Sequence, residues 1–258
     1  MEVIIQPSER HATELAAQHI ARLLRDKPSA VLGLATGRSQ MGVYEELVRM
    51  HREEGLDFSQ VTTFNLDEYI GLGPEHPGSF HHYMQEHLFG GVNVDPEHVH
   101  VPNGMVQEVD AHCVAYEAAI AAAGGIDLQL LGIGTDGHIG FNEPSSSLSS
   151  RTRIKTLAAE TLRDNADAFA ADEVPRHVIT MGIGTIMDTR ECLLLALGEH
   201  KAQAVAAAVE GPITASIPAS ALQMHPAARV VLDEAAASLL TRASYYKSVY
   251  EGKPDWQR

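Results

Sequence analysis

The chain is poor in cysteine, in long apolar runs and in basic residues. Its 258 residues include two cysteines, Cys113 and Cys192, which lie far apart and outside any CxxC pattern. Neither a disulfide framework nor a cysteine zinc site is therefore expected. No apolar run approaches the roughly 18 residues that cross a bilayer, and the first residues do not read as a secretory signal. We expect a cytoplasmic protein without a membrane anchor.

Basic residues are outnumbered by acidic ones. There are 19 lysines and arginines against 34 aspartates and glutamates, which gives a formal net charge of -15. Such a surface repels polyanions, and no dense basic stripe offsets the repulsion locally, so nucleic acid is not an expected partner. A small phosphate ester remains compatible with this charge, because it needs only one loop with a few N–H donors.

Hydrophobic residues make up 45% of the chain and alternate between strand-like and helix-like patterns. This alternation predicts an α/β fold with a mainly parallel sheet and helices on both faces. No repeat or linker divides the chain, so we expect one domain over residues 1–258. The expected strands are 30–35, 61–66, 128–133, 178–181, 192–197 and 229–232. The expected helices are 8–25, 40–52, 111–123, 200–209 and 234–245.

Two of the expected strands end in polar residues that suggest a ligand site. After the first strand, Thr36-Gly37-Arg38-Ser39 leads through a glycine into a helix, whose free N–H groups can hold a phosphate. The segment lacks the Walker spacing, and a plain turn is equally compatible with it. After the second strand come Asp67 and Glu68. A carboxylate there can serve as a general base, although a helix cap or solvated turn is the simpler interpretation of an isolated pair.

Two further strand ends carry a histidine and a lysine. In the glycine-rich stretch from Gly132 to Pro144, Asp136 and Glu143 flank His138. An imidazole held by carboxylates can keep one tautomer and relay protons near neutral pH, so this setting favours a functional histidine. Lys201 follows a later strand and can offer its ammonium group to a phosphate, although a lysine early in a helix is commonplace.

Other catalytic constellations find little support. His81 and His82 lack zinc-ligand spacing and are expected on a helix, so no metal site is predicted. There is no G-x-S-x-G, and Ser145-Ser146-Ser147 is typical of a polar loop. Proton transfer without a metal ion or covalent intermediate fits these residues best.

Taken in order, these segments resemble the glucosamine-6-phosphate deaminase family over nearly the whole chain. The resemblance includes Asn65 to Tyr69, Asp136 to Pro144, Ser150 to Leu157 and Ala208 to Gly211. It implies a Rossmann-like fold and a hydrolase that acts on an amino-sugar phosphate without a cofactor. The implied reaction converts glucosamine 6-phosphate and water into fructose 6-phosphate and ammonia.

The resemblance also implies roles for individual residues. Asp67 would be the base that moves a proton between C2 and C1 of the sugar, and His138 would open the sugar ring. Asp136 and Glu143 would orient and tune the imidazole. The positions that match the family's phosphate grip are Thr36, Gly37, Ser39 and Lys201.

The chain departs from the family pattern in two places. Arg38-Ser39-Gln40 stands where Gly-Thr-Pro is expected, and the stretch 165–169 lacks an arginine that usually binds the phosphate. We hypothesise that Arg38 supplies the missing guanidinium, since a bidentate fork to phosphate suits arginine. The alternative is that Arg38 points away, and that the enzyme prefers another amino-sugar phosphate or binds phosphate weakly.

Regulation and two rival functions stay open from the sequence. Arg153 and Lys155 match positions that bind N-acetylglucosamine 6-phosphate as an allosteric activator between subunits of a homo-oligomer, whereas 217–220 is more similar to monomeric members. A 6-phosphogluconolactonase shares the architecture, but usually has Asp-Glu-Arg where this chain has Asp67-Glu68-Tyr69. A non-catalytic sugar-phosphate sensor normally carries a DNA-binding module, for which we find no room.

Overall fold

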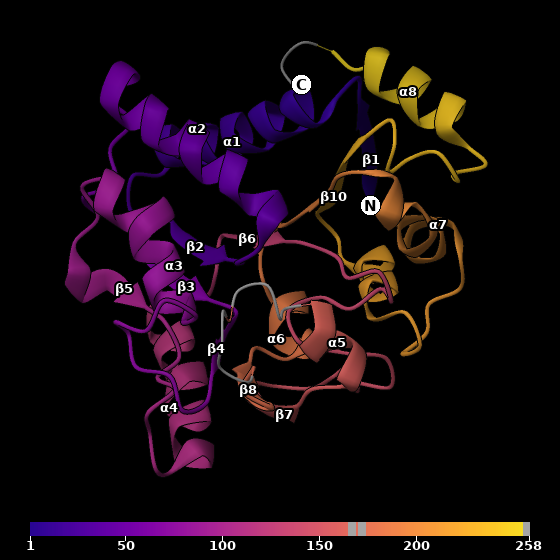
Figure 1. Ribbon diagram of the computed structural model, residues 1–258. Helices are drawn as coiled ribbons and strands as arrows, with labels where there is room; N and C mark the ends of the chain where they lie inside the picture. The colour runs from indigo at the N-terminus through magenta and orange to yellow at the C-terminus, as the bar shows by residue number, and fades with distance from the viewer. Residues whose placement is uncertain (165–168, 170–173, 255–258) are drawn as a thin grey trace.

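The computed structural model describes residues 1–164, 169 and 174–254, and its main feature is a seven-stranded parallel sheet (Figure 1). The strand order is β1-β10-β9-β6-β2-β3-β5, and every neighbouring pair runs parallel. The strands are β1 (Glu2–Gln6), β2 (Val31–Leu34), β3 (Thr62–Asn65), β5 (Val99–His100), β6 (Leu128–Leu131), β9 (Cys192–Ala196) and β10 (Ala228–Asp233).

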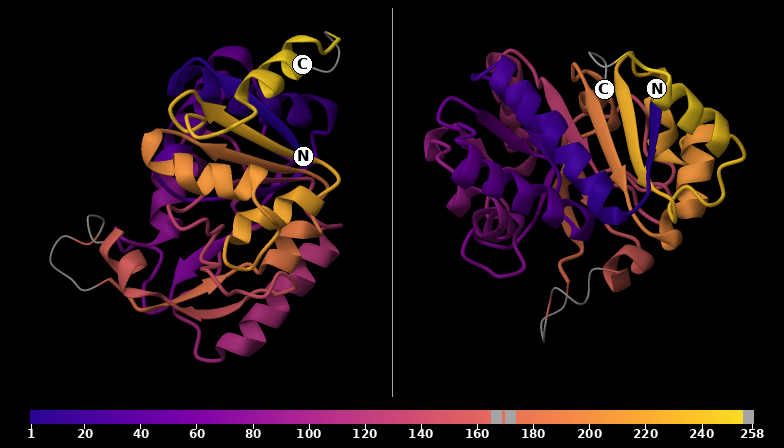
Figure 2. Two further views of the ribbon diagram at one scale, coloured as in Figure 1. Left: turned by 90° about the vertical axis from the view of Figure 1, so that its right-hand side faces the viewer. Right: turned by 90° about the horizontal axis from the view of Figure 1, so that it is seen from above.

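Helices cover both faces of this sheet, which confirms the predicted Rossmann-like α/β fold (Figures 1 and 2). One apolar layer packs α1 and α2 against the sheet, and the other packs α4 and α7. Within the described ranges, no helix has both the length and the apolarity to cross a bilayer. The helices are α1 (Glu9–Asp26), α2 (Arg38–Glu54), α3 (Phe80–His87), α4 (Val109–Ala122), α5 (Ala159–Asp164), α6 (Ile183–Met187), α7 (Ala202–Glu210) and α8 (Ala243–Glu251).

The first helix illustrates how the sequence specifies its own boundaries. Ser8 is the N-cap of α1, and its side chain accepts a hydrogen bond from the His11 N–H. This bond satisfies one of the backbone donors that a helix start leaves unpaired. The buried side chains of α1 recur at helical spacing, with Ala12, Ala16 and Ile20 among them, so the helix presents one apolar face to the sheet.

The order of the strands reverses between β2 and β6. After β2 the next strand of this sheet is β3, on one side, whereas after β6 the next strand of this sheet is β9, on the other side. In an open α/β sheet, ligands bind outside the carboxyl ends of the strands at such a switch point. A ligand site is therefore expected among the residues that follow β2 and β6.

A second sheet has three antiparallel strands, β4 (Asp67–Tyr69), β8 (His177–Thr180) and β7 (Arg153–Thr156), and lies at the lower end of the molecule in Figure 1. The strand expected over 178–181 is confirmed as β8, and it belongs to this small sheet and not to the parallel one. An apolar run reports burial but not the strand with which it pairs. In β7 only alternate residues are half-buried, which left no apolar run to detect.

The helix expected over 234–245 is wrong in position. The segment after β10 forms tight turns, in which Ser238 N–H donates to Ala235 and Leu240 N–H donates to Ala237. The Asp233 carboxylate accepts the N–H of Ala236 at 2.8 Å and that of Gly198 at 3.0 Å. The first of these is a cap-like contact, but the chain continues in turns and not in a helix. Helix α8 begins only at Ala243. That residues 1–258 form a single domain stays a prediction.

Candidate active site

Four polar segments lie at the carboxyl ends of four adjacent strands. Thr36 to Ser39 follow β2, Asp136 to His138 follow β6, Lys201 follows β9, and Asp67 comes shortly after β3. The strands stand side by side in the order β9-β6-β2-β3. Residues that are distant in sequence are thus brought to one edge of the sheet, around the switch point.

The loop after β2 has the geometry of an anion site. Gly37 is the N-cap of α2 and has a φ of 137°, a conformation that side chains with a Cβ rarely adopt. Arg38 and Ser39 follow in the first helical turn, where backbone N–H groups point outward and the helix dipole favours an anion. Thr36 and Ser39 are half-buried, and Arg38 is exposed.

Asp67 and Glu68 are both buried but serve different parts of the structure. Glu68 accepts hydrogen bonds from the N–H groups of Phe80 and His81, each at 3.0 Å, and so caps α3. Asp67 is 5% exposed, and its Oδ2 lies 3.5 Å from the place that a Cβ at Gly140 would take. The Asp67 carboxylate therefore reaches the loop that carries His138.

Burial raises the pKa of Asp67 to about 8, and the charge of Glu68 adds to the rise. Burial also raises the pKa of Glu68, although the hydrogen bonds that its carboxylate accepts from backbone N–H groups oppose this rise. Both effects follow from the cost of keeping a carboxylate charged away from water. A carboxyl group that titrates near neutral pH is suited to take and return a proton.

His138 folds back over the end of its own strand. A Cβ at Gly134 would lie 2.2 Å from the imidazole Cε1, so only glycine leaves room for the ring. The ring Nδ1 lies 2.6 Å from Asp136 Oδ1, at ion-pair distance, although its geometry is not that of a hydrogen bond. Burial raises the pKa of Asp136, but the nearby His138 ring and the His138 backbone N–H, which Asp136 Oδ1 accepts at 3.1 Å, hold that pKa below its ordinary value.

Glu143 is directed elsewhere than the resemblance implies. Its Oε1 accepts the Ala158 N–H at 2.9 Å and the Thr161 hydroxyl at 2.5 Å, at the start of α5. Within the described part of the chain, Glu143 makes no hydrogen bond to the His138 ring. Of the two carboxylates, Asp136 lies at the imidazole, whereas the turn after Phe141 carries Glu143 toward α5. The roles of both in orienting and tuning the imidazole stay predictions.

Three polar residues at this edge escaped the sequence prediction. Gln40 is 2% exposed, and its Nε2 is enclosed without a hydrogen-bond partner. It lies 2.9 Å from the place of a Cβ at Gly132, between the ends of β2 and β6. Thr180 belongs to no recognisable sequence motif, yet its hydroxyl accepts a hydrogen bond from the Phe141 N–H. Tyr83 donates its hydroxyl to the Gly37 carbonyl. Of the three, only Gln40 carries a signal in the sequence, because it follows the Thr36–Ser39 motif directly, in the first turn of the helix.

The remaining predicted residues lie on the small sheet, where Arg153 is paired with Thr180, or outside the described residues. Arg153 and Lys155 belong to β7 of the small sheet, and Arg153 is half-buried. The stretch 165–168, where a phosphate-binding arginine is missing from the sequence, lies outside the described residues. Among the residues that are described, no group of three or more histidine, cysteine, aspartate or glutamate side chains is placed to hold a metal ion.

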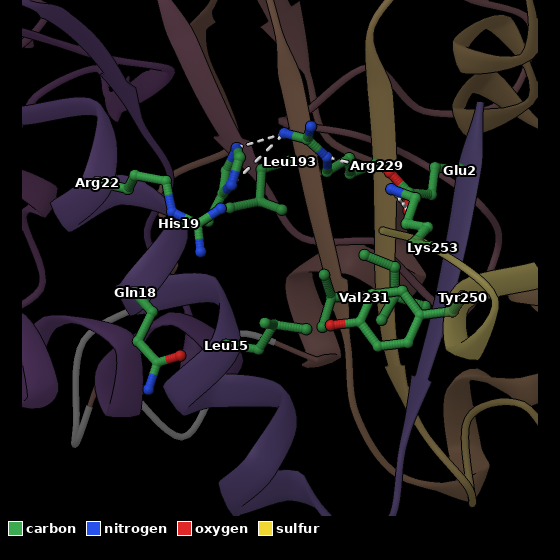
Figure 3. Close-up of a pocket in the computed structure, with 11 residues that line it drawn as sticks. Glu2, Leu15, Gln18, His19, Arg22, Leu193, Arg229, Val231, Tyr250 and Lys253 are labelled. Atoms are coloured by element: carbon green, nitrogen blue, oxygen red, sulfur yellow. Dashed lines mark hydrogen bonds and ion pairs between the residues drawn. The ribbon is translucent and has the colours of Figure 1, made fainter. Parts of the chain in front are cut away.

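A separate cavity of about 40 Å³ lies at the opposite, amino-terminal ends of β1, β9 and β10 (Figure 3). Ion pairs surround it: Arg229 contacts both Glu2 and Glu191, and His19 lies 2.7 Å from Glu191. These charges satisfy one another. Because ligands of such sheets bind at the carboxyl ends, we assign the chemistry to the switch point and not to this cavity.

The fold and the strand-end residues define a doubly wound α/β protein with a polar site at its switch point. Comparison with family models adds that residues 6–232 match the family described as glucosamine-6-phosphate isomerases/6-phosphogluconolactonase. The chain belongs to this family.

Full-length relatives agree with this assignment. A glucosamine-6-phosphate deaminase of Arthrobacter sp. (strain FB24) is 57% identical over 100% of this chain and 99% of its own length. One of Streptomyces coelicolor is 53% identical with the same coverage.

A solved structure described as a monomeric glucosamine-6-phosphate deaminase has a TM-score of 0.91 and 43% identity. It covers 93% of this chain and 100% of that one. The 6-phosphogluconolactonase of Trypanosoma brucei matches with a TM-score of 0.75 over 93% of this chain and 98% of its own. At 17% identity it indicates the shared fold alone.

Proposed function

We propose that the chain is a glucosamine-6-phosphate deaminase that converts glucosamine 6-phosphate and water into fructose 6-phosphate and ammonia. The observation that supports this proposal most directly is that Asp67, a buried carboxyl at one strand end, reaches Gly140 in the same loop as His138. The names of the full-length relatives support the same reaction. These names describe a deaminase and an isomerase, so our expectation of a hydrolase is not supported.

In this proposal the phosphate is the anchor of the substrate. The N–H groups of the α2 first turn hold it, with Ser39 and Lys201 beside them. The sugar then extends along the switch point toward His138. His138 relays a proton from the anomeric hydroxyl to the ring oxygen, which opens the ring, while Asp136 keeps the imidazole in position.

Asp67 then acts on the open-chain sugar. Its carboxylate takes the C2 proton to give an enolamine and returns a proton to C1, which leaves an imine at C2. Water adds to the imine, and ammonia leaves to give the ketose. The burial that raises the pKa of Asp67 makes the carboxylate a stronger base once it is ionised. Glu143, held at the start of α5, fixes the turn that follows the His138 loop.

The assay that tests this function offers the protein glucosamine 6-phosphate, galactosamine 6-phosphate and unphosphorylated glucosamine, and measures ammonia. We expect release from the first substrate above all and very little from the third, because the third lacks the anchor. Hydrolysis of 6-phosphogluconolactone without ammonia release from any amino sugar would contradict the proposal.

Regulation is a finer part of the same proposal. Arg153 and Lys155 lie on β7, which is joined to the Asp67 strand through β8. An N-acetylglucosamine 6-phosphate bound at β7 in a homo-oligomer would act on Asp67 through this sheet. Sigmoidal kinetics abolished by that compound would support regulation, and hyperbolic kinetics unaffected by it would count against it.

A further inference from the structure

The Gly37 carbonyl is held on both sides at the start of the phosphate loop. It accepts the Gln40 N–H at 3.2 Å and the Tyr83 hydroxyl at 2.8 Å. A carbonyl oxygen has two lone pairs, so both are used. An anion site at a helix start needs its N–H groups turned outward and its carbonyl oxygens turned away, because the oxygens repel the anion. The Tyr83 bond fixes this orientation.

A second tyrosine holds the neighbouring carbonyl. Tyr44 on α2 is fully buried and donates its hydroxyl to the Ala35 carbonyl at 2.5 Å. The rings of Tyr44 and Tyr83 pack edge to face, with centroids 6.4 Å apart and planes at 72°. Carbonyls on either side of Thr36 are therefore each held by a phenol, one from α2 and one from α3.

The helix that carries Tyr83 is itself fixed to the strand of the proposed base. Glu68 accepts the N–H groups of Phe80 and His81 in the first turn of α3, and Tyr83 lies in the turn that follows. Because Glu68 is adjacent to Asp67, the chain of contacts runs from the Asp67 strand through α3 to Gly37. The strand of the proposed base and the phosphate loop are thus connected through hydrogen bonds to the same helix, α3.

We propose that Tyr83 is a positioning residue of the phosphate loop. Its hydroxyl keeps the Gly37 carbonyl turned away from the bound phosphate monoester, and Glu68 fixes the helix from which it acts. Tyr83 does not itself touch the substrate. The inference rests on the proposed function, because it assumes that the α2 start receives the phosphate of the sugar.

The test is Tyr83→Phe, which keeps the ring and removes the hydroxyl. We measure the Kd of inorganic phosphate by calorimetry, the KM and kcat for glucosamine 6-phosphate, and the thermal midpoint. We expect phosphate affinity to fall about five-fold and KM to rise by about the same factor, with kcat nearly unchanged. Such a factor is the usual size of one net hydrogen bond, about 1 kcal/mol. A merely structural role would lower the thermal midpoint without this split.

Tyr246→Phe is the matched control. It removes another tyrosine hydroxyl, one that lies near Glu210 at the end of α7 away from Lys201. Phosphate affinity and KM should stay at the native values in this variant.

Three outcomes would overturn the inference. They are a native phosphate affinity in Tyr83→Phe, a fall in kcat without a change in KM, and a native protein that binds no phosphate. Failure of the proposed function is distinguishable from these. If the native protein binds phosphate but releases no ammonia, the assigned reaction is wrong, and the calorimetry still decides the role of Tyr83.

Discussion

Asp67 and Glu68 are consecutive residues of β4, and their carboxyl groups make contacts on opposite sides of that strand. Glu68 accepts two N–H groups at the start of α3, whereas Asp67 faces Gly140 in the loop of His138. Successive side chains of a strand alternate in direction, so the pair does not form a carboxylate dyad. Glu68 fixes the start of α3, and Asp67 is available for proton transfer.

The pKa of Asp67 gives the first prediction. Since burial raises it to about 8, the base is mostly protonated at neutral pH. We expect kcat/KM to rise with pH through about 8, after correction for the titration of the substrate amine and phosphate. A ¹³C NMR titration of aspartate-labelled protein, with Asp67→Asn to identify the resonance, should place the midpoint near the same pH. A midpoint near 4, the ordinary range of aspartate, would refute the assignment.

The same shift predicts a cost in stability. A carboxyl whose pKa is higher in the folded than in the unfolded state binds more protons when folded, so stability falls as pH rises from about 4 to about 8. Asp67→Asn cannot ionise and escapes this loss. Its advantage over the native protein in the free energy of unfolding should widen by on the order of 3 kcal/mol between about pH 5 and about pH 8.

Urea unfolding of both proteins at the two pH values measures this gap. Glu97→Gln is a suitable control, because Glu97 is an exposed carboxyl remote from Asp67 in the chain. A constant difference between native protein and Asp67→Asn would show that Asp67 ionises as easily in the folded as in the unfolded state.

Arg38 gives a prediction about the phosphate. It lies in the first turn of α2, at the loop that we assign to this group. If it supplies the guanidinium that the sequence lacks at 165–169, Arg38→Ala should raise KM for glucosamine 6-phosphate about ten-fold or more, with a much smaller loss of kcat. Arg52→Ala, at the other end of the same helix, should leave KM unchanged. An unchanged KM in Arg38→Ala would dispose of the hypothesis.

Much of the fold was predictable because it depends on local patterns. The apolar runs that became β2, β6 and β9 are buried throughout, and each ends in a glycine turn with polar residues. Parallel strands place such ends on one edge, which is why the sequence alone predicts that the motifs at Thr36, His138 and Lys201 lie together.

The rest depended on contacts between distant segments. The partner of β8 is set by β4 and β7, neither of which has an apolar run of its own. Tyr83 reaches Gly37 only because Glu68 fixes α3, and no spacing in the sequence reports that contact. The contacts of Glu143 with the start of α5 were not predictable for the same reason, since its distance along the chain from His138 does not specify which way the intervening turn points.

The most direct test follows the proton itself. Glucosamine 6-phosphate that carries deuterium at C2 is given to native protein and to Asp67→Asn, and ammonia release and the deuterium at C2 and C1 are measured by NMR. We predict that native protein removes deuterium from C2 as ammonia appears, and that kcat/KM falls on the order of 10³-fold in the folded variant. Near-native ammonia release by Asp67→Asn would contradict the account.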